Sequence, residues 1–483
     1  MKAWEAVIGL EVHVELKTES KLFSVAPNRF GDAPNSNITE VCSGQPGALP
    51  VLNEEAVYKA VLFGAAVNAK IAKRSSFDRK SYFYPDSPRN FQITQFYEPI
   101  IEGGTIICDV EGEQKEFAIN HAHLEDDAGM LKHFPGYALV DYNRAGVPLL
   151  EIVSKPCIHS PKQAAAYASS IRAIMLYVGS SDCNMEEGSM RMDANVSVRP
   201  KGERGLRTKT EIKNLNSFYN MEKALEAEIN RQIRCYCQDP DKDPSTIIQQ
   251  ATYRWDAEKK ENQLMRRKES SEDYRYFPEP DLPELVVQDA LIEKAKKSIP
   301  ELPYKKEKRY IKDYNLKATS AKQISLDKML ANFFEEGLNH CKDPIALSNW
   351  ILVEFAGRLE GRPIYESGLN AANVASLVDM IDKKTITGKI AKKVADEMLA
   401  NPSKPAHEII ASKPEYQPLN DNAALEKIVD EVLEENPKLL ADYIAGKEKV
   451  WGFFIGQAMK KSRGKAAPDQ LQKIFEEKIH AKR

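Results

Sequence analysis

The stretch Val7-Ile8-Gly9-Leu10-Glu11-Val12-His13-Val14-Glu15-Leu16 alternates aliphatic and polar side chains from Ile8 onward. A period of two is typical of a β-strand with one buried and one open face. The open face presents Glu11, His13 and Glu15. Three ionisable groups in this arrangement are either ordinary solvated surface or the floor of a site, and spacing alone favours the solvated edge. Imidazole and carboxylate both bind divalent cations, so a metal site is the functional alternative.

Length and composition limit the classes of protein to consider. A chain of 483 residues, 42% hydrophobic and 29% charged, predicts an ordinary globular protein of two to four domains. It contains no run of about 20 apolar residues, and its first residues lead directly into the strand, so we expect no membrane span, signal peptide or transit peptide. The seven cysteines form no even framework, and Cys235 and Cys237 are two apart. We therefore expect reduced thiols in a cytoplasmic protein rather than a zinc site.

Residues 1–293 are predicted to form an α+β domain built on a mostly antiparallel sheet. Helices are expected at 54–69 after Asn53, at 161–178 between Ser160 and Gly179, and at 217–236. The alternation over 190–199 and 206–213 predicts an antiparallel hairpin with a mixed charged face, which suits a wet pocket for a charged ligand. Residues 238–285 are polar and are predicted to be irregular.

From about residue 294 the pattern predicts helices only. Apolar residues recur at i, i+3, i+4 and i+7 over 374–381 and 425–432. A linker-like composition over 361–368 divides this region into segments 294–366 and 367–483. From Lys447 to Arg483 ten lysines and arginines face four acids, a net charge of +6 on a chain of net charge −3. This basic end predicts an anionic partner, with a plain solvated face as the alternative.

Three other stretches carry groups suited to a site. Residues 77–91 interleave aromatic, basic and proline residues, which either stack on a base and meet phosphates or pack on their own domain. Residues 121–129 hold two histidines and three acids. Glu151 lies inside the apolar run Val147-Pro148-Leu149-Leu150-Glu151-Ile152-Val153. Burying this carboxylate alone is costly, so we expect it to meet a cation or a hydrogen-bond donor, and a metal or an arginine would both serve.

The motifs that are absent narrow the chemistry. The sequence has no G-x-x-x-x-G-K-[ST], no G-x-G-x-x-G, no H-E-x-x-H and no G-x-S-x-G. These absences argue against a P-loop NTPase and against a hydrolase with an acyl-enzyme. The remaining carboxylates, histidines and basic aromatic loops fit magnesium-assisted phosphoryl transfer, which needs oxygen ligands and cations more than a protein nucleophile.

Six stretches resemble the B subunits of tRNA-dependent amidotransferases (the GatB family): residues 7–16, 79–86, 186–189, 213–217, 273–281 and 456–460. They occur in family order and span nearly the whole chain. The resemblance implies a "cradle" catalytic domain, then an all-α helical domain, then an all-α tail domain that binds tRNA.

The resemblance also implies an activity, that of an ATP-dependent carbon–nitrogen ligase with glutamine as amido donor. The B subunit would bind misacylated Glu-tRNA(Gln), Asp-tRNA(Asn) or both, and would phosphorylate the side-chain carboxylate with ATP and Mg²⁺. Ammonia made by the amidase (A) subunit would reach it through a channel, and a small C subunit would hold the heterotrimer together.

Carried onto this chain, the resemblance implies roles for particular residues. The catalytic and metal-binding residues would be Glu11, His13, Glu125 and Glu151, with Asp126 as a further metal ligand. Several family members have Glu at position 126, and the shorter Asp126 favours a water-bridged contact. Arg79, Lys80 and Tyr82 would line the pocket for ATP or for the acyl end of the tRNA. The tRNA phosphates would meet Lys460, Lys461, Arg463 and Lys465.

Two rival functions are compatible with parts of the sequence. A non-enzymatic tRNA-binding scaffold would explain the basic helical end but not the ionisable residues Glu11, His13, Glu125 and Glu151. A free-standing metal phosphohydrolase would explain those residues but would not need the tail.

Overall fold

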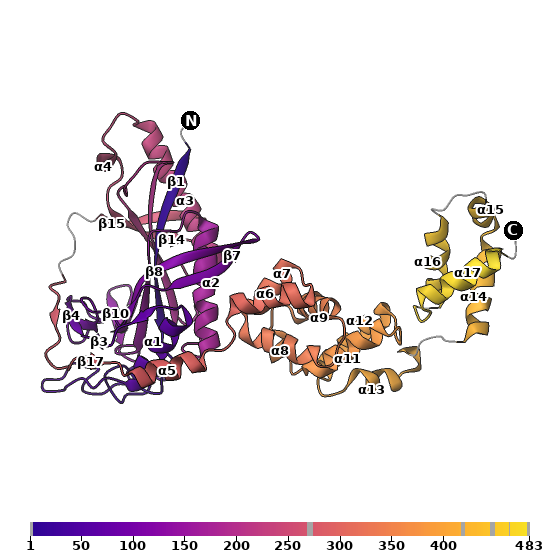
Figure 1. Ribbon diagram of the computed structural model, residues 1–483, viewed down its shortest axis with the longest axis horizontal. Coiled ribbons are helices and arrows are strands. Elements are labelled where there is room, and N and C mark those ends of the chain that lie inside the picture. The colour runs from indigo at the N-terminus through magenta and orange to yellow at the C-terminus, as the bar shows by residue number, and fades with distance from the viewer. Residues whose placement is uncertain (1–2, 268–273, 417–420, 445–449, 463, 481–483) are drawn as a thin grey trace. The chain divides into compact units, whose positions relative to one another are not determined.

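The computed structural model describes residues 3–267, 274–416, 421–444, 450–462 and 464–480. The chain forms two compact units, residues 1–306 and 307–483 (Figure 1). The first combines a large sheet with a few helices and the second is helical, so the predicted α+β class is confirmed. The division into domains 1–293, 294–366 and 367–483 stays a prediction.

The first unit is rich in strands. Its longer strands are β1 (Trp4–Glu15), β7 (Thr105–Val110), β8 (Glu113–Asp126), β9 (Met130–Phe134), β10 (Tyr137–Asp141), β11 (Pro148–Ser154), β12 (Met190–Pro200), β14 (Ala251–Asp256) and β15 (Glu261–Arg267). The shorter ones are β2 (Lys70–Ile71), β3 (Arg74–Ser75), β4 (Asp78–Ser81), β5 (Phe91–Thr94), β6 (Ile101–Glu102), β13 (Thr210–Lys213), β16 (Phe277–Pro278) and β17 (Leu285–Val286). Its helices are α1 (Glu54–Ala66), α2 (Pro161–Val178), α3 (Phe218–Gln238), α4 (Pro244–Ile247) and α5 (Asp289–Ser298).

A ten-stranded sheet organises the first unit. Its order is β15-β14-β13-β12-β1-β11-β8-β6-β2, and β7 pairs with β8 off this path. All neighbours are antiparallel except β13 and β14, which run parallel. The opening strand β1 lies between β11 and β12, so it is interior to the sheet.

Helices cover the apolar face of this sheet. Leu10, Val12 and Val14 of β1 are completely buried and belong to one core that also includes residues of α1, α2 and α3. Local signals set these helices: Asn53, Ser160 and Ser217 each accept a backbone N–H at the helix start, and Gly179 ends α2 with φ 71°. Because the helices occupy one face, the opposite face with Glu11 and His13 stays open for a site.

The expectation of irregular structure over 238–285 was wrong. Strands β14 and β15 lie there and extend the sheet beyond β13. Trp255 and Thr252 of β14 are buried, and this strand pairs in parallel with β13, from which α3 and α4 separate it in the sequence. A short polar strand of this kind is stabilised by pairing with a strand that is distant in the sequence. Its own residues therefore show little hydrophobic periodicity from which a strand could be predicted.

The aromatic and proline-containing stretch 77–91 lies beside a second one, Tyr274-Arg275-Tyr276-Phe277-Pro278-Glu279-Pro280. Strand β4 pairs with β5 on one side and with β16 on the other, so residues 78–81 and 277–278 share a three-stranded sheet. Two further small sheets join β9 to β10 and β3 to β17.

The second unit is helical. Helix α6 (Pro303–Tyr314) crosses the boundary between the units. It is followed by α7 (Ala318–Leu326), α8 (Lys328–Leu338), α9 (Pro344–Asn349), the π-helix η1 (Trp350–Phe355), α10 (Ala356–Leu359), the 3₁₀ turn η2 (Ile364–Glu366), α11 (Ala371–Asp382), α12 (Gly388–Ala400), α13 (Ala406–Ala411), the 3₁₀ turn η3 (Pro414–Tyr416), α14 (Asn422–Glu435), α15 (Pro437–Ile444), α16 (Trp451–Lys461) and α17 (Pro468–His480).

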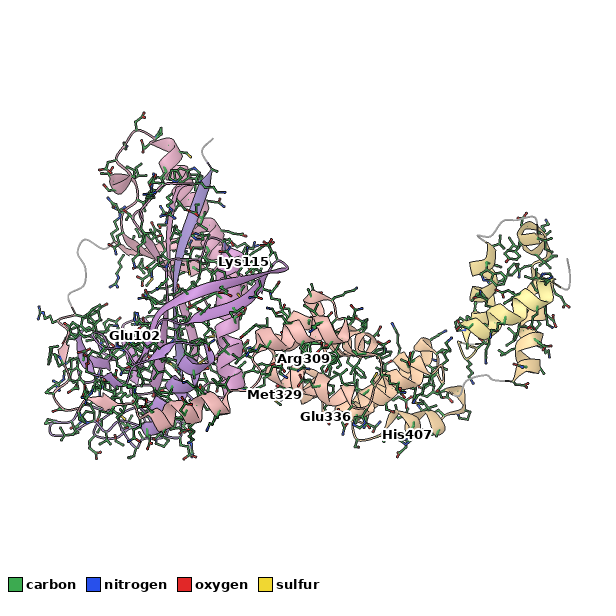
Figure 2. All side chains as sticks on the ribbon, in the orientation of Figure 1. Glu102, Lys115, Arg309, Met329, Glu336 and His407 are labelled. Carbon is green, nitrogen blue, oxygen red and sulfur yellow. The ribbon has the colours of Figure 1, made fainter. Side chains whose placement is uncertain are left out.

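Apolar helical faces hold the second unit together. Phe334, Phe355 and Leu377 are buried among α8 to α11, while Met329 of α8 is exposed (Figure 2). A separate cluster around Phe454 and Phe475 joins α14, α16 and α17. Among the residues that the structure describes, no helix is long and apolar enough to cross a membrane. All seven cysteines are free thiols, as expected.

Candidate active site

The register of the sheet brings three distant segments together on its open face. Glu151 of β11 is directly opposite His13 of β1 on one side and His123 of β8 on the other. Directly opposed residues of antiparallel strands point to the same face. His123, Glu151 and His13 therefore form one row across three adjacent strands, and Glu125 follows His123 two residues later on the same face.

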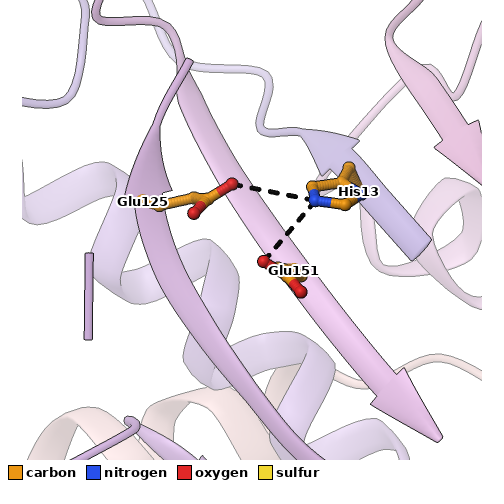
Figure 3. Close-up of side chains that lie close together, drawn as sticks. All are labelled: His13, Glu125 and Glu151. Atoms are coloured by element: carbon orange, nitrogen blue, oxygen red, sulfur yellow. Dashed lines mark ion pairs between the residues drawn. The ribbon is translucent and has the colours of Figure 1, made fainter. Parts of the chain in front are cut away.

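The side chains of this row converge. The Nε2 atom of His13 lies 3.5 Å from Oε2 of Glu151 and 3.8 Å from Oε1 of Glu125 (Figure 3). The Nε2 atom of His123 lies 3.3 Å from Oε2 of Glu151. One nitrogen or oxygen atom from each of His13, Glu125 and Glu151 lies within 4.8 Å of the others. We call these three residues the triad.

The triad is a compact, coupled set of charges. Burial alone lowers the pKa of His13 and of His123, but the neighbouring glutamates outweigh burial, so the pKa of His13 rises and that of His123 rises to about 10. Burial acts to raise the pKa of Glu151, yet the two imidazoles hold it well below its usual range. Burial also acts to raise the pKa of Glu125, but the hydrogen bond from His123 and the charge of Lys80 help to lower it below its ordinary value. Both carboxylates are therefore ionised at neutral pH.

The donor set fits a divalent cation. The two carboxylates supply the oxygen ligands that Mg²⁺ takes, and a neutral imidazole is a ligand for divalent transition metals. Oε2 of Glu125 and Nδ1 of His123 are buried and have no hydrogen-bond partner in the described part of the chain. Buried polar atoms are normally satisfied, so these two are open to a hydrogen bond or coordination from a bound ion or water. A bound metal would require the imidazole of His13 to be neutral.

Lys80 adds a positive charge beside the triad. It belongs to β4, and burial would lower its pKa, but the charges of Glu125 and Glu151 raise it above its ordinary value. Its Nζ atom lies 5.2 Å from the ring centroid of Tyr274. Lys80 is therefore a protonated group held between the carboxylates and an aromatic ring.

Glu11 lies next to the triad and outside the converging set. Its Oε1 atom accepts a hydrogen bond of 2.8 Å from Nδ2 of Asn195 on the neighbouring strand. Burial and the nearby charge of Glu151 raise its pKa. The geometry gives Glu11 a place at the edge of the site, one step of the alternation away from His13.

Asp126 is directed away from the triad to other partners. Its carboxylate pairs with Arg89, and its Oδ1 atom accepts the backbone N–H of Ile93 at 2.8 Å. Its backbone oxygen accepts a hydrogen bond of 2.8 Å from Nε2 of Gln92. Asp126 thus attaches β5, and through it the Lys80-bearing β4, to the end of β8.

Arg79 and Tyr82 differ in their surroundings, although they are three residues apart. The Arg79 guanidinium binds both carboxylate oxygens of Glu279 at 2.8 Å and Oδ2 of Asp281 at 3.0 Å. These contacts join β4 to the 277–281 segment. Tyr82 instead lines a pocket of about 510 Å³ together with Lys80, and burial raises its pKa to about 12.

A second pocket borders His13 itself. It measures about 550 Å³, and Arg191, Lys213 and Arg254 contribute to its walls. Lys213 binds Oδ2 of Asp193 at 2.7 Å and lies 3.2 Å from Oε1 of Glu211. Through His13 the triad therefore borders a pocket that basic groups line.

The basic residues near the C-terminus have unequal surroundings. Lys460 is exposed, whereas Lys461 pairs with Glu431 at 3.1 Å and with Glu435 at 2.6 Å. Nζ of Lys465 donates to the backbone oxygen of Pro414 at 3.1 Å. Arg463 lies outside the described residues.

Two members of the site were not assigned from the sequence. His123 contacts Glu125 and Glu151, and the available signal was its position two residues before Glu125 on one strand. Arg191 is directly opposite His13 on β12 and binds Asp127 at 2.5 Å. Its signal was the alternation of β12, which places Arg191 on the charged face.

Comparisons with known proteins cover nearly the whole chain. Residues 6–293 match the GatB/GatE catalytic domain family, and residues 332–479 match the GatB domain family. A protein of Protochlamydia amoebophila is 59% identical over 478 residues, which is 99% of this chain and 97% of that protein. Proteins of Chlamydia pneumoniae and Chlamydia abortus are 57% and 56% identical over 98% of this chain and 97% of their own length. Each of the three is named as the B subunit of an aspartyl/glutamyl-tRNA(Asn/Gln) amidotransferase.

Proposed function

This chain belongs to the GatB family of tRNA amidotransferase subunits, and on that basis we propose that its first unit carries the phosphoryl-transfer and amide-forming site of the enzyme. The observation that carries the proposal is the convergence of His13, Glu125 and Glu151 on the open face of the sheet. The substrates are Glu-tRNA(Gln), Asp-tRNA(Asn) or both.

The reaction has two steps. An oxygen of the side-chain carboxylate on the tRNA attacks the γ-phosphorus of ATP; the bond from γ-phosphorus to the bridging oxygen breaks, and ADP leaves. Ammonia then attacks the carbon of the acyl phosphate, the C–O bond to phosphate breaks, and the nitrogen loses a proton to the departing phosphate to give the amide. His13, Glu125 and Glu151 would hold a Mg²⁺ ion, which would supply charge neutralisation at the transferring phosphoryl group.

The residues around the triad fit this chemistry. Lys80 remains protonated and supplies a fixed positive charge on one side, where the carboxylate and phosphate charges meet. Arg191 provides a second cation opposite His13. Positive groups placed before the reaction need no reorganisation when charge moves.

Partner subunits complete the proposed enzyme. The amidase (A) subunit supplies ammonia from glutamine, and the small C subunit joins the two. A dry conduit suits the reaction because water would hydrolyse the acyl phosphate and protonate ammonia. Residues 367–483 bind the tRNA, with exposed cations such as Lys460 against its phosphates.

The test is phosphate release by the purified complex. The complex is incubated with [γ-³²P]ATP, Mg²⁺ and Glu-tRNA(Gln), without glutamine. We expect phosphate release that depends on the aminoacyl-tRNA and is absent with deacylated tRNA. Release that is independent of the aminoacyl group, or its absence, would refute the kinase assignment and favour the scaffold alternative.

A further inference from the structure

A lysine outside the triad is completely buried. Lys21 comes shortly after β1 and has no exposed surface. Its Nζ atom donates to the backbone oxygens of Ala145 at 2.7 Å and Tyr142 at 3.2 Å, and to Sγ of Cys42 at 3.7 Å. These three acceptors match the three hydrogens of an ammonium group. The hydrogen-bond pattern therefore favours a buried cation at Lys21.

A buried ammonium group requires an anion beside it. No carboxylate of the described residues forms an ion pair with Lys21, and the sulfur of Cys42 occupies that position. The same sulfur lies 3.1 Å from Oγ of Ser24 and 3.5 Å from Oγ1 of Thr39, two hydroxyls that can donate to it. Burial would raise the pKa of the Cys42 thiol, but these hydrogen bonds and the charge of Lys21 lower it below its ordinary value. The surroundings of Cys42 thus favour a thiolate.

A small cavity borders this pair. It measures about 20 Å³, and Lys21, Ser24, Cys42 and Arg89 contribute to its walls. A cavity of about 10–15 Å³ already holds one water molecule, so this one admits a slightly larger molecule. Cys42 keeps 5% of its surface exposed, and Ser24 beside it is half-buried. A small oxidant such as hydrogen peroxide can therefore reach the sulfur.

The sulfur and the nitrogen are also close enough to react with each other. Their separation of 3.7 Å is near the ~3–3.5 Å between atoms that are poised to form a bond. A thiolate is the form of cysteine that an oxidant attacks first, and the resulting sulfenic acid condenses with a neighbouring nitrogen to a sulfenamide. Lys21 supplies a side-chain nitrogen at this sulfur.

We propose that Cys42 and Lys21 form an oxidation site at which hydrogen peroxide leads to an S–N bond between their side chains. The thiolate attacks one oxygen of the peroxide, the O–O bond breaks, and the hydroxide that leaves takes a proton from Lys21. The neutral Nζ then attacks the sulfenic sulfur, the S–O bond breaks, and hydroxide leaves with a proton from the nitrogen as water. The sulfur loses two electrons to the peroxide, which ends as two molecules of water. The inference does not depend on the proposed function.

Peptide mapping of the full-length chain tests the bond directly. The folded protein is treated with hydrogen peroxide, its remaining thiols are blocked with iodoacetamide, and it is digested with trypsin without reductant. Cleavage after Arg29 separates Lys21 from Cys42, so only a covalent bond keeps peptides 18–29 and 30–59 together. We expect this joined pair with a mass lower by two hydrogen atoms than the sum of the free peptides. Dithiothreitol should separate it, because the sulfenic and sulfenamide states are reversible.

Cys183 is the internal control, since it is also buried but burial raises its pKa to about 11. Cys42 should be oxidised about tenfold or more faster than Cys183, because the thiolate is the nucleophile. This comparison is made within the wild-type chain and does not depend on the folding of a variant.

Two variants separate the steps. Lys21→Arg keeps a cation beside the sulfur, so fast oxidation should remain, with the sulfenic acid trapped by dimedone on unfolding, while the S–N bond is lost. Ser24→Ala removes one hydroxyl from the sulfur and should slow the oxidation of Cys42, with the melting temperature as the check on folding. Oxidation of Cys42 no faster than that of Cys183 would overturn the inference. So would oxidised Cys42 found only as a sulfinic acid or a disulfide, with no bond to Lys21.

Discussion

His13 and Glu151 are directly opposed across β1 and β11, with Nε2 and Oε2 3.5 Å apart. Each reaches the open face of the sheet because its strand alternates, and the pairing register makes them neighbours. The same register brings in His123 and, two residues later, Glu125. A one-residue slip of either strand would turn its ligands into the core, so the fold and the site depend on the same pairing.

Glu151→Gln should abolish transamidation, because an amide cannot supply the anionic oxygen that the triad provides. We expect kcat/KM to fall by about 100-fold or more. Removing a residue that only hydrogen-bonds to a metal ligand costs about 10- to 100-fold, and loss of a ligand itself should cost at least as much. Glutaminase activity of the complex should survive in part. The control Glu113→Gln alters an exposed glutamate on β8 and should leave both activities unchanged. Full transamidation by Glu151→Gln would remove the triad from the mechanism.

Mg²⁺ should stabilise the wild-type chain against unfolding. A ligand that binds only the folded state adds about 2.7 kcal/mol at 100 times its Kd. Thermal unfolding with increasing Mg²⁺ should therefore raise the melting temperature of the wild-type protein and not that of Glu151→Gln. An equal rise in both proteins would place the ion elsewhere.

Asp126→Ala should affect stability more than metal affinity. The substitution leaves the Arg89 guanidinium and the Ile93 N–H without their partner, a loss of about 3 kcal/mol or more for a buried pair. Asp126→Asn should cost less, because its amide oxygen can still accept from Ile93. Urea unfolding and Mg²⁺ titration measure the two effects. Loss of Mg²⁺ affinity with unchanged stability would instead support direct ligation by Asp126.

Lys80→Met should slow phosphoryl transfer, because it removes the cation beside Glu125 and Glu151. Loss of one preorganised electrostatic group costs about 10²–10³-fold in kcat. Arg79→Met is the matched comparison: it breaks the contacts with Glu279 and Asp281 and should lower stability while leaving the Kd of ATP within about twofold. The catalytic role of Lys80 would be refuted by an unchanged kcat in Lys80→Met. The structural role of Arg79 would be refuted by a large rise in the Kd of ATP in Arg79→Met.

Lys460→Ala should weaken tRNA binding and reduce the slope of log K against log salt by about one. Lys461→Ala should have a smaller effect, because Glu431 and Glu435 already neutralise that lysine. Filter binding at several salt concentrations measures both slopes, and the Kd of ATP should not change in either variant. Identical slopes in wild type and Lys460→Ala would exclude this lysine from the phosphate contacts.

The local elements of this protein could be predicted from its sequence. The alternation of β1, the Asn53 and Ser160 caps, and the stop at Gly179 depend only on neighbouring residues. A partner for Glu151 could also be predicted, because burying an unpaired carboxylate is costly. In the structure its partners are His13 and His123. Strands β14 and β15 escaped detection because their stability comes from pairing across the sheet.

The tertiary structure alone decided which candidates meet. Residues 13, 125 and 151 converge because antiparallel register aligns strands that are far apart in the sequence, and no local pattern encodes that alignment. For the same reason the sequence could not show that Asp126 turns to Arg89, or that Lys21 lies beside Cys42. The types of residue in the sequence were enough to propose candidates for the site. Only the register of the paired strands determines which of these candidates lie close together.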